Sequence, residues 1–147
     1  MVKRLRTRVI RAASFGCRDW GVIAEALLTV MAMQIGLHVF TFPRLLAWTR
    51  RIRAGTPLPA DKVLHAAWLV SIACRLTPCR CLARSLTLAR VLGRRGVATE
   101  MRIGVLTEGG ALQAHAWVEW MGRVLNDHPG NLQRFAPFDR SIEIANV

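Results

Sequence analysis

The first regular hydrophobic pattern in the chain is a long apolar segment at residues 22–42. It is about as long as a bilayer span of roughly 20 residues, but Glu25 and other polar residues interrupt it. Basic residues flank it on both sides, so the positive-inside rule assigns no orientation. The pattern therefore favours a buried or membrane-surface helix over a true span. We expect this helix to start near Asp19, as its N-cap, and to run to about Val39.

Two further helical segments follow, separated by a linker. Pro43 ends the first helix and opens a shorter amphipathic one, "PRLLAWTRRIR". The linker is "AGTPLPAD", residues 54–61, whose glycine and prolines are typical of a connection between units. A third helix is predicted over residues 62–76, where apolar residues recur on one face.

The segment at residues 77–96 has the best-marked helix boundaries in the chain. Thr77 fits an N-cap and Pro78 the first helical position, where its missing N–H costs nothing. Gly96 fits a C-terminal cap behind two arginines of the last turn. This assignment places Cys81 in the first turn of the helix.

After this helix the hydrophobic period changes from helical to two, which predicts strands. A first strand is expected at residues 98–106, followed by a turn at "EGGA". Residues 115–120 and 123–127 are expected to form a second and a third strand. Helices followed by a small antiparallel sheet define the α+β class.

Composition fits a single folded domain with one strongly basic end. The chain has 147 residues, 52% of them hydrophobic, which permits a real core and excludes a disordered chain. Residues 1–60 hold ten Lys and Arg against two acidic residues, within a net charge of +12. We therefore divide the chain into a basic arm with a helical extension, residues 1–60, and one compact core, residues 61–147.

The charge favours an acidic peptide or an anionic membrane as a partner. Nucleic acid is not expected, because no zinc-finger or RNP pattern accompanies the basic residues. Arg8 and Arg11 interrupt the apolar positions that a signal peptide would need. We expect a cytoplasmic protein with reduced cysteines and peripheral contact with a membrane.

The stretch "AHAWVEWMGRVLND", residues 114–127, predicts a hairpin with His115 at one end and Asp127 at the other. A three-residue turn with Gly122 in the left-handed conformation would place these two residues opposite each other. A two-residue turn at Met121 and Gly122 would instead leave His115 a diagonal neighbour of Asp127. The charge match between Glu119 and Arg123 favours the three-residue turn.

Cys81 supplies a candidate nucleophile for this pair. A helix N-terminus favours the thiolate form of a cysteine, and the thiolate is the nucleophile. A histidine can accept and return its proton, and a carboxylate can fix the tautomer of the histidine. Cys79 is the local rival, Cys74 is expected in the core, and a metal site built from these cysteines has unusual spacing.

Five segments together resemble one family, the transglutaminase-like cysteine peptidase of lasso-peptide biosynthesis, which is one half of a split B protein. They are "CLARSL" (81–86), "RRG" (94–96), "IGV" (103–105), "AHAWVE" (114–119) and "GRVLND" (122–127). The resemblance implies a papain/transglutaminase-like core behind the N-terminal helices. It also implies a catalytic Cys-His-Asp triad of Cys81, His115 and Asp127, with no metal or cofactor.

The resemblance further implies a substrate and two partners. The substrate would be a ribosomally made precursor peptide, whose leader the enzyme removes before an asparagine-synthetase-like cyclase closes the macrolactam. Fused members begin with a leader-gripping winged-helix-like domain, but residues 1–60 lack its strands. Leader recognition is therefore expected on a separate protein. Trp117, Arg84 and Ser85 are candidate substrate-binding residues.

Two other functions remain open at this point. The chain could be a non-enzymatic protein that uses residues 22–42 and the basic arm to bind a membrane surface or a partner. Alternatively, the same fold could carry out acyl transfer to an amine rather than hydrolysis.

Overall fold

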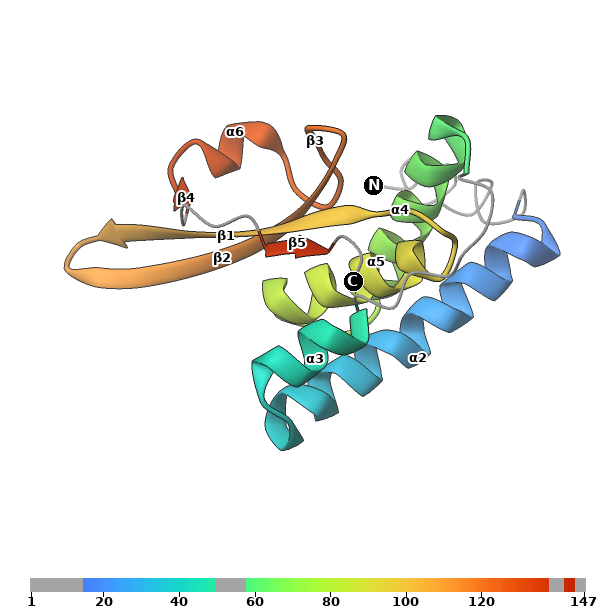
Figure 1. Cartoon of the computed structure of the whole chain (residues 1–147), viewed down its shortest axis with the longest axis horizontal. Coiled ribbons are helices and arrows are strands. Elements are labelled where there is room, and N and C mark those ends of the chain that lie inside the picture. Colours follow the sequence, from blue (N-terminus) through green and yellow to red (C-terminus); the bar gives the residue numbers. More distant parts are fainter. Residues whose placement is uncertain (1–14, 50–57, 138–141, 145–147) are drawn as a thin grey trace, which may run out of the picture.

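The computed structural model describes residues 15–49, 58–137 and 142–144, and it places helices before strands (Figure 1). The helices are α2 (Cys17–Val39), α3 (Phe42–Thr49), α4 (Ala60–Arg75) and α5 (Cys81–Gly93). The strands are β1 (Thr99–Glu108), β2 (Ala111–Trp120), β3 (Arg123–Val124), β4 (Ala136–Pro137) and β5 (Ile142–Ile144), with the short helix α6 (Pro129–Leu132) before β4. The predicted α+β class is confirmed. Residues 1–14 of the basic arm, the end of the second predicted helix at 50–53 and the first half of the predicted linker, 54–57, lie outside the described residues.

Helices α2, α4 and α5 share the main hydrophobic core. From α2 the inward side chains include Ala26 and Val30, both fully buried, and from α5 they include Leu88 and Val91. The sequence of α2 is apolar on nearly all sides, but only one side of the helix packs into the core. The division of the chain at residue 60 remains a prediction, although α2 packs directly on the helices that follow it.

Asp19 is not the N-cap of α2. The helix begins at Cys17 behind Gly16, and Asp19 stands in the first turn, where Oδ2 accepts a hydrogen bond from the N–H of Gly16 at 3.3 Å. Its other carboxylate oxygen pairs with Nε2 of His65 on α4 at 2.9 Å. Asp19 thus closes the helix start and ties α2 to α4.

The start of α5 also differs from the prediction. Thr77 and Pro78 lie in the turn after α4, the N-cap is Arg80, and Cys81 is the first helical residue. The backbone N–H of Cys79 already bonds to the carbonyl of Thr77 at 2.8 Å, so the chain turns once more before the helix begins. Cys81 therefore lies at the N-terminal end of α5, where backbone N–H groups lack hydrogen-bond partners within the helix.

The sheet is antiparallel and is built on the long β1–β2 hairpin, in the order β3-β2-β1-β4, with β5 also paired to β1. The Gly109–Gly110 turn joins β1 to β2 and pairs Glu108 with Ala111, as the "EGGA" pattern predicted. In Figure 1 the tip of this hairpin extends away from the helices, whereas its base lies beside α5.

The predicted three-residue turn between β2 and β3 is wrong. The ladder pairs Trp120 with Arg123 and Glu119 with Val124, which leaves Met121 and Gly122 as a two-residue turn. Both turn residues have positive φ, 50° and 75°, the combination that the tightest hairpin turns require. The third strand ends at Val124 rather than at Asp127.

Candidate functional site

His115 and Asp127 form a direct pair at the base of the hairpin. Nε2 of His115 lies 2.5 Å from Oδ2 of Asp127, and the two side chains are 24% and 18% exposed. An ionised carboxylate can only accept hydrogen bonds, so the imidazole donates its Nε2–H. This bond fixes the tautomer and directs Nδ1 away from Asp127.

Asp127 keeps its negative charge because several donors surround it. Partial burial raises its pKa, but hydrogen bonds from the His128 backbone N–H, from His115 and from the Asn131 amide outweigh burial and lower the pKa below its usual value. The backbone N–H of His128 lies 2.6 Å from Oδ1, and Nδ2 of Asn131 lies 3.1 Å from the same oxygen. The carboxylate is thus held in place from three directions.

Two aromatic rings enclose the imidazole. Trp117 stacks on His115 with ring centroids 6.2 Å apart, and Phe135 lies 5.1 Å away on a tilted plane. Nε1 of Trp117 donates to Glu119 at 2.8 Å, which fixes the orientation of the indole. Gly104 pairs with His115 across the hairpin, and a Cβ there would come within 3.0 Å of both Trp117 and Phe135. The absent side chain therefore makes room for both rings.

A buried polar network connects α5 to the strand that carries His115. Ser85 is fully buried, and its hydroxyl donates to the carbonyl of Ala116 at 2.9 Å. Asn126 donates to the Ser85 oxygen at 2.9 Å and accepts from the N–H of Val118 at 2.8 Å. The same amide therefore links the helix, β2 and the residue that precedes Asp127.

Cys81 lies one helical turn before Ser85, on the same side of α5. Residues four apart on a helix have Cβ atoms roughly 5–6 Å apart. Ser85 bonds to Ala116, the neighbour of His115, so the first two turns of α5 lie close to the part of β2 that carries the imidazole. No hydrogen bond joins Cys81 to His115 in the described part of the chain. Cys81 is partly exposed, so a substrate can reach it.

The other cysteines have different environments. Cys74 is buried in the core as predicted, and burial together with the neighbouring Cys79 raises its pKa to about 12. Cys79 precedes α5, and its Sγ donates to the carbonyl of Cys74 at 3.3 Å. This contact directs Cys79 toward Cys74. Among residues 15–49, 58–137 and 142–144, no three His, Cys, Asp or Glu side chains gather closely enough to hold a metal ion.

The three predicted substrate-binding residues have different environments in the structure. Ser85 does not fit that role, because its side chain is fully buried and engaged in the α5–β2 network. Trp117 is also buried, at 5% exposed, and supports His115 as a wall. Arg84 is partly buried, and its Nε has no hydrogen-bond partner among the described residues. Its predicted contact with the substrate remains a prediction.

Sequence reasoning missed four residues that shape this site: Asn126, Asn131, Phe135 and Gly104. Asn126 and Gly104 lie inside the quoted segments "GRVLND" and "IGV", but neither had been given a role. Asn131 and Phe135 come after the last strand that the periodicity predicted, so the pattern carried no signal for them. His128, next to Asp127, caps α6, because its Nδ1 accepts from the N–H of Gly130.

The Transglutaminase-like superfamily matches this chain over residues 27–140. The match covers most of the sequence and includes Cys81, His115 and Asp127, so the chain belongs to this superfamily. Membership indicates an activity of the cysteine-protease or acyltransferase type. No curated protein and no solved structure matches the chain.

Proposed function

We propose that this protein is a cysteine peptidase that removes the leader from a ribosomally made lasso-peptide precursor. Cys81 is the nucleophile, His115 the general base and acid, and Asp127 the orienting carboxylate. The observation that carries the proposal is the hydrogen-bonded His115–Asp127 pair. The proposal is supported by the bond from Ser85, one turn after Cys81 on α5, to the carbonyl of Ala116, the neighbour of His115. The leader-peptidase assignment rests in addition on the five sequence segments that resemble that family.

In the first half of the reaction, Nδ1 of His115 takes the proton of the Cys81 thiol. The sulfur then attacks the carbonyl carbon at the junction of leader and core. Backbone N–H groups at the start of α5 stabilise the oxyanion that forms, since they lack acceptors within the helix. The C–N bond breaks, His115 gives its proton to the departing amine, and the leader remains on Cys81 as a thioester.

In the second half, His115 takes a proton from water, and the resulting hydroxide attacks the thioester. The leader leaves with a free carboxylate, and the proton returns to Cys81. Asp127 stabilises the imidazolium in both halves without accepting its proton. The core peptide now has the free α-amine that a macrolactam cyclase needs, which is why an asparagine-synthetase-like enzyme fits as the partner of the next step.

The described residues before the core are helical, in α2 and α3. Following the resemblance to the split B proteins, we propose that a separate small protein recognises the leader. The assay should therefore contain the full-length chain, that partner and the precursor peptide.

The test measures leader release by mass spectrometry with wild-type protein and with Cys81→Ala. Cys79→Ala is the matched control, because it removes a neighbouring thiol that points to Cys74. We expect cleavage to be lost only in the Cys81 variant. Full cleavage by Cys81→Ala would reject the proposal, and loss in the Cys79 variant alone would move the nucleophile to that residue.

Acyl transfer is the second candidate, because superfamily membership is compatible with it. An amine would then replace water in attack on the thioester. Adding a primary amine to the cleavage assay separates the two reactions. A leader that ends in an amide indicates acyl transfer, whereas a leader that ends in a carboxylate indicates peptidase activity.

A further inference from the structure

One face of α2 and α3 carries large apolar side chains in contact with solvent. We call it the α2–α3 apolar face, made up of Trp20, Leu28, Met31, Ile35, Val39, Phe40 and Trp48. Leu28 is 74% exposed, Val39 66% and Ile35 60%. A lone exposed apolar residue is ordinary, but a contiguous set of this kind marks an interaction surface.

The spacing shows that this face is a continuous stripe. Leu28, Met31, Ile35 and Val39 recur every three or four residues and so lie on one side of α2. The opposite side packs into the core through Val30 and Met33. At 23 residues, α2 is about 35 Å long, so the stripe has the length of a membrane contact rather than of a single side-chain pocket.

The stripe carries no charge along most of its length. From Trp20 to Pro43 the only charged residue is Glu25. Glu25 is turned away from the stripe, where its carboxylate pairs with Arg94 at 3.1 Å and with Arg95 at 2.7 Å. Between Trp20 and Pro43, therefore, Glu25 is the only residue whose charge could oppose contact with hydrocarbon, and it is paired on the other side of the helix.

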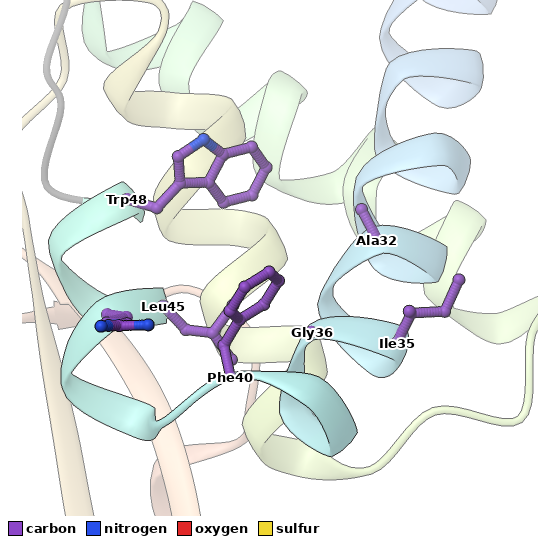
Figure 2. Close-up of a pocket in the computed structure, with 7 residues that line it drawn as sticks. Ala32, Ile35, Gly36, Phe40, Leu45 and Trp48 are labelled. Carbon is purple, nitrogen blue, oxygen red and sulfur yellow. The ribbon is translucent and has the colours of Figure 1, made fainter.

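At its C-terminal end the face opens into an apolar groove of about 600 Å³. Figure 2 shows the rings of Phe40 and Trp48 bordering the space between α3 and the Ala32–Ile35 side of α2. Arg44 also lines this groove, and its side chain has no ion pair or hydrogen bond within the described residues. The apolar lining of this groove matches a lipid acyl chain, and the guanidinium of Arg44 matches the anionic headgroup above that chain.

The charge of the chain selects the occupant of this face. The net charge is +12, so two copies packed face to face would repel each other. In the sequence, five Lys and Arg precede α2 within residues 1–14, and three Arg follow α3 within residues 50–57, with no acidic residue in either segment. Basic residues beside an apolar helix face with aromatic residues are typical of helices that lie in the headgroup region of anionic membranes.

We infer that the α2–α3 apolar face binds the surface of an anionic lipid bilayer, with α2 parallel to the membrane plane. α2 is long and apolar enough to cross a bilayer. It does not do so in this fold, because crossing would pull Val30 and Met33 out of the core. The α2–α3 apolar face shares no residue with the proposed catalytic site at Cys81, His115 and Asp127. The inference does not depend on the proposed peptidase activity.

The test is sedimentation of the full-length protein with vesicles. One set is phosphatidylcholine alone, and the other contains added phosphatidylglycerol. We expect binding to the anionic vesicles that weakens as salt increases. Ile35→Glu should lower the partition coefficient about tenfold or more, because it replaces one inserted apolar side chain with a charge.

The matched control is Leu112→Glu, which makes the same kind of change at a residue 72% exposed near the tip of the β1–β2 hairpin. Circular dichroism verifies that both variants fold. Equal binding of the two variants, or no binding of wild-type protein to anionic vesicles, would overturn the inference. So would a wild-type dimer in light scattering that Ile35→Glu converts to monomer, since a second copy would then cover the face.

Discussion

Nε2 of His115 bonds to Asp127 even though the two residues are not cross-strand partners. The two-residue turn sets the register so that the ladder ends at Glu119 and Val124, and Asp127 lies beyond the last strand residue. Asn126 bends the chain there by bonding to both Val118 and Ser85. The pair is therefore built by side chains around the end of the hairpin rather than by the ladder itself.

Asp127→Asn should strongly reduce catalysis while leaving the fold intact. An amide cannot stabilise the imidazolium, and it can favour the wrong tautomer of His115. We expect the rate of leader cleavage to fall by about 10²- to 10⁴-fold. Glu108→Gln, which breaks an exposed pair with Arg134, is the control and should keep wild-type activity. A wild-type rate in Asp127→Asn would remove this residue from the proposed triad.

The same carboxylate should make stability depend on pH. Its pKa is lower in the folded protein than in the unfolded chain, so folding favours the ionised form. This contribution is fully present above the unfolded value of about 3.9, and it is lost as the pH falls through the folded pKa. Urea unfolding of wild type and Asp127→Asn from acid to neutral pH should show a difference that grows with pH and levels off above about pH 5. A difference independent of pH would contradict this linkage.

Ser85→Ala should destabilise the protein and loosen the site. The change removes the hydrogen-bond donor to the buried Ala116 carbonyl and the acceptor of the Asn126 Nδ2–H group. We expect the free energy of unfolding to fall by about 1–3 kcal/mol in denaturant titrations. Ser71→Ala is the control, because that hydroxyl only bonds back to Trp68 on the same helix. Its effect should stay within about 0.5 kcal/mol, and equal losses in the two variants would argue against the network.

Gly104→Ala should disturb the aromatic wall. The new methyl would lie 3.0 Å from Phe135 Cβ and from the Trp117 ring, so one of them must shift. We expect a loss of about 1–3 kcal/mol in stability, a changed tryptophan fluorescence spectrum and slower cleavage. Gly21→Ala on α2 meets no atom within 4 Å and should instead stabilise the protein by up to about 1 kcal/mol. Unchanged fluorescence and activity in Gly104→Ala would show that the wall is not needed.

Met121→Asn should stabilise the hairpin. Met121 is 86% exposed and has a φ of 50°, a conformation that costs a non-glycine residue about 1 kcal/mol or more. Asparagine tolerates this conformation, and Asn-Gly is a preferred pair for a two-residue turn. A higher urea midpoint with an unchanged slope is the expected result. Met121→Val is the opposing variant and should lower the midpoint, while no difference between the two would mean that the turn is not strained.

Much of the fold follows from local patterns in the sequence. The change from helical to two-residue periodicity predicts helices before strands, and the "EGGA" turn and the end of α2 near Val39 lie where expected. These features depend on neighbouring residues alone. The start of α5 was misplaced because Thr77 and Pro78 satisfy capping rules equally well in the turn that precedes the helix.

Charge matching between Glu119 and Arg123 chose the wrong hairpin register because the fold supplies Glu119 with other partners. Oε1 accepts from the Trp117 indole, and Oε2 lies 3.4 Å from Nε of Arg102 on β1. A local count cannot include a competitor from a distant strand. Arg123 is therefore free to face Trp120, as the tight turn requires.

The sequence by itself determined the helix-then-strand order, the apolar length of α2 and the residue types Cys81, His115 and Asp127 that the chemistry needs. Only the tertiary structure decided which of them meet. In the fold, Ser85 is buried and links α5 to β2 rather than contacting a substrate. Asn131 and Phe135 contact the His115–Asp127 pair, and Asn126 holds the segment just before Asp127. The physical reason is that hydrogen-bond partners and burial depend on segments far apart in the chain, which local periodicity does not record.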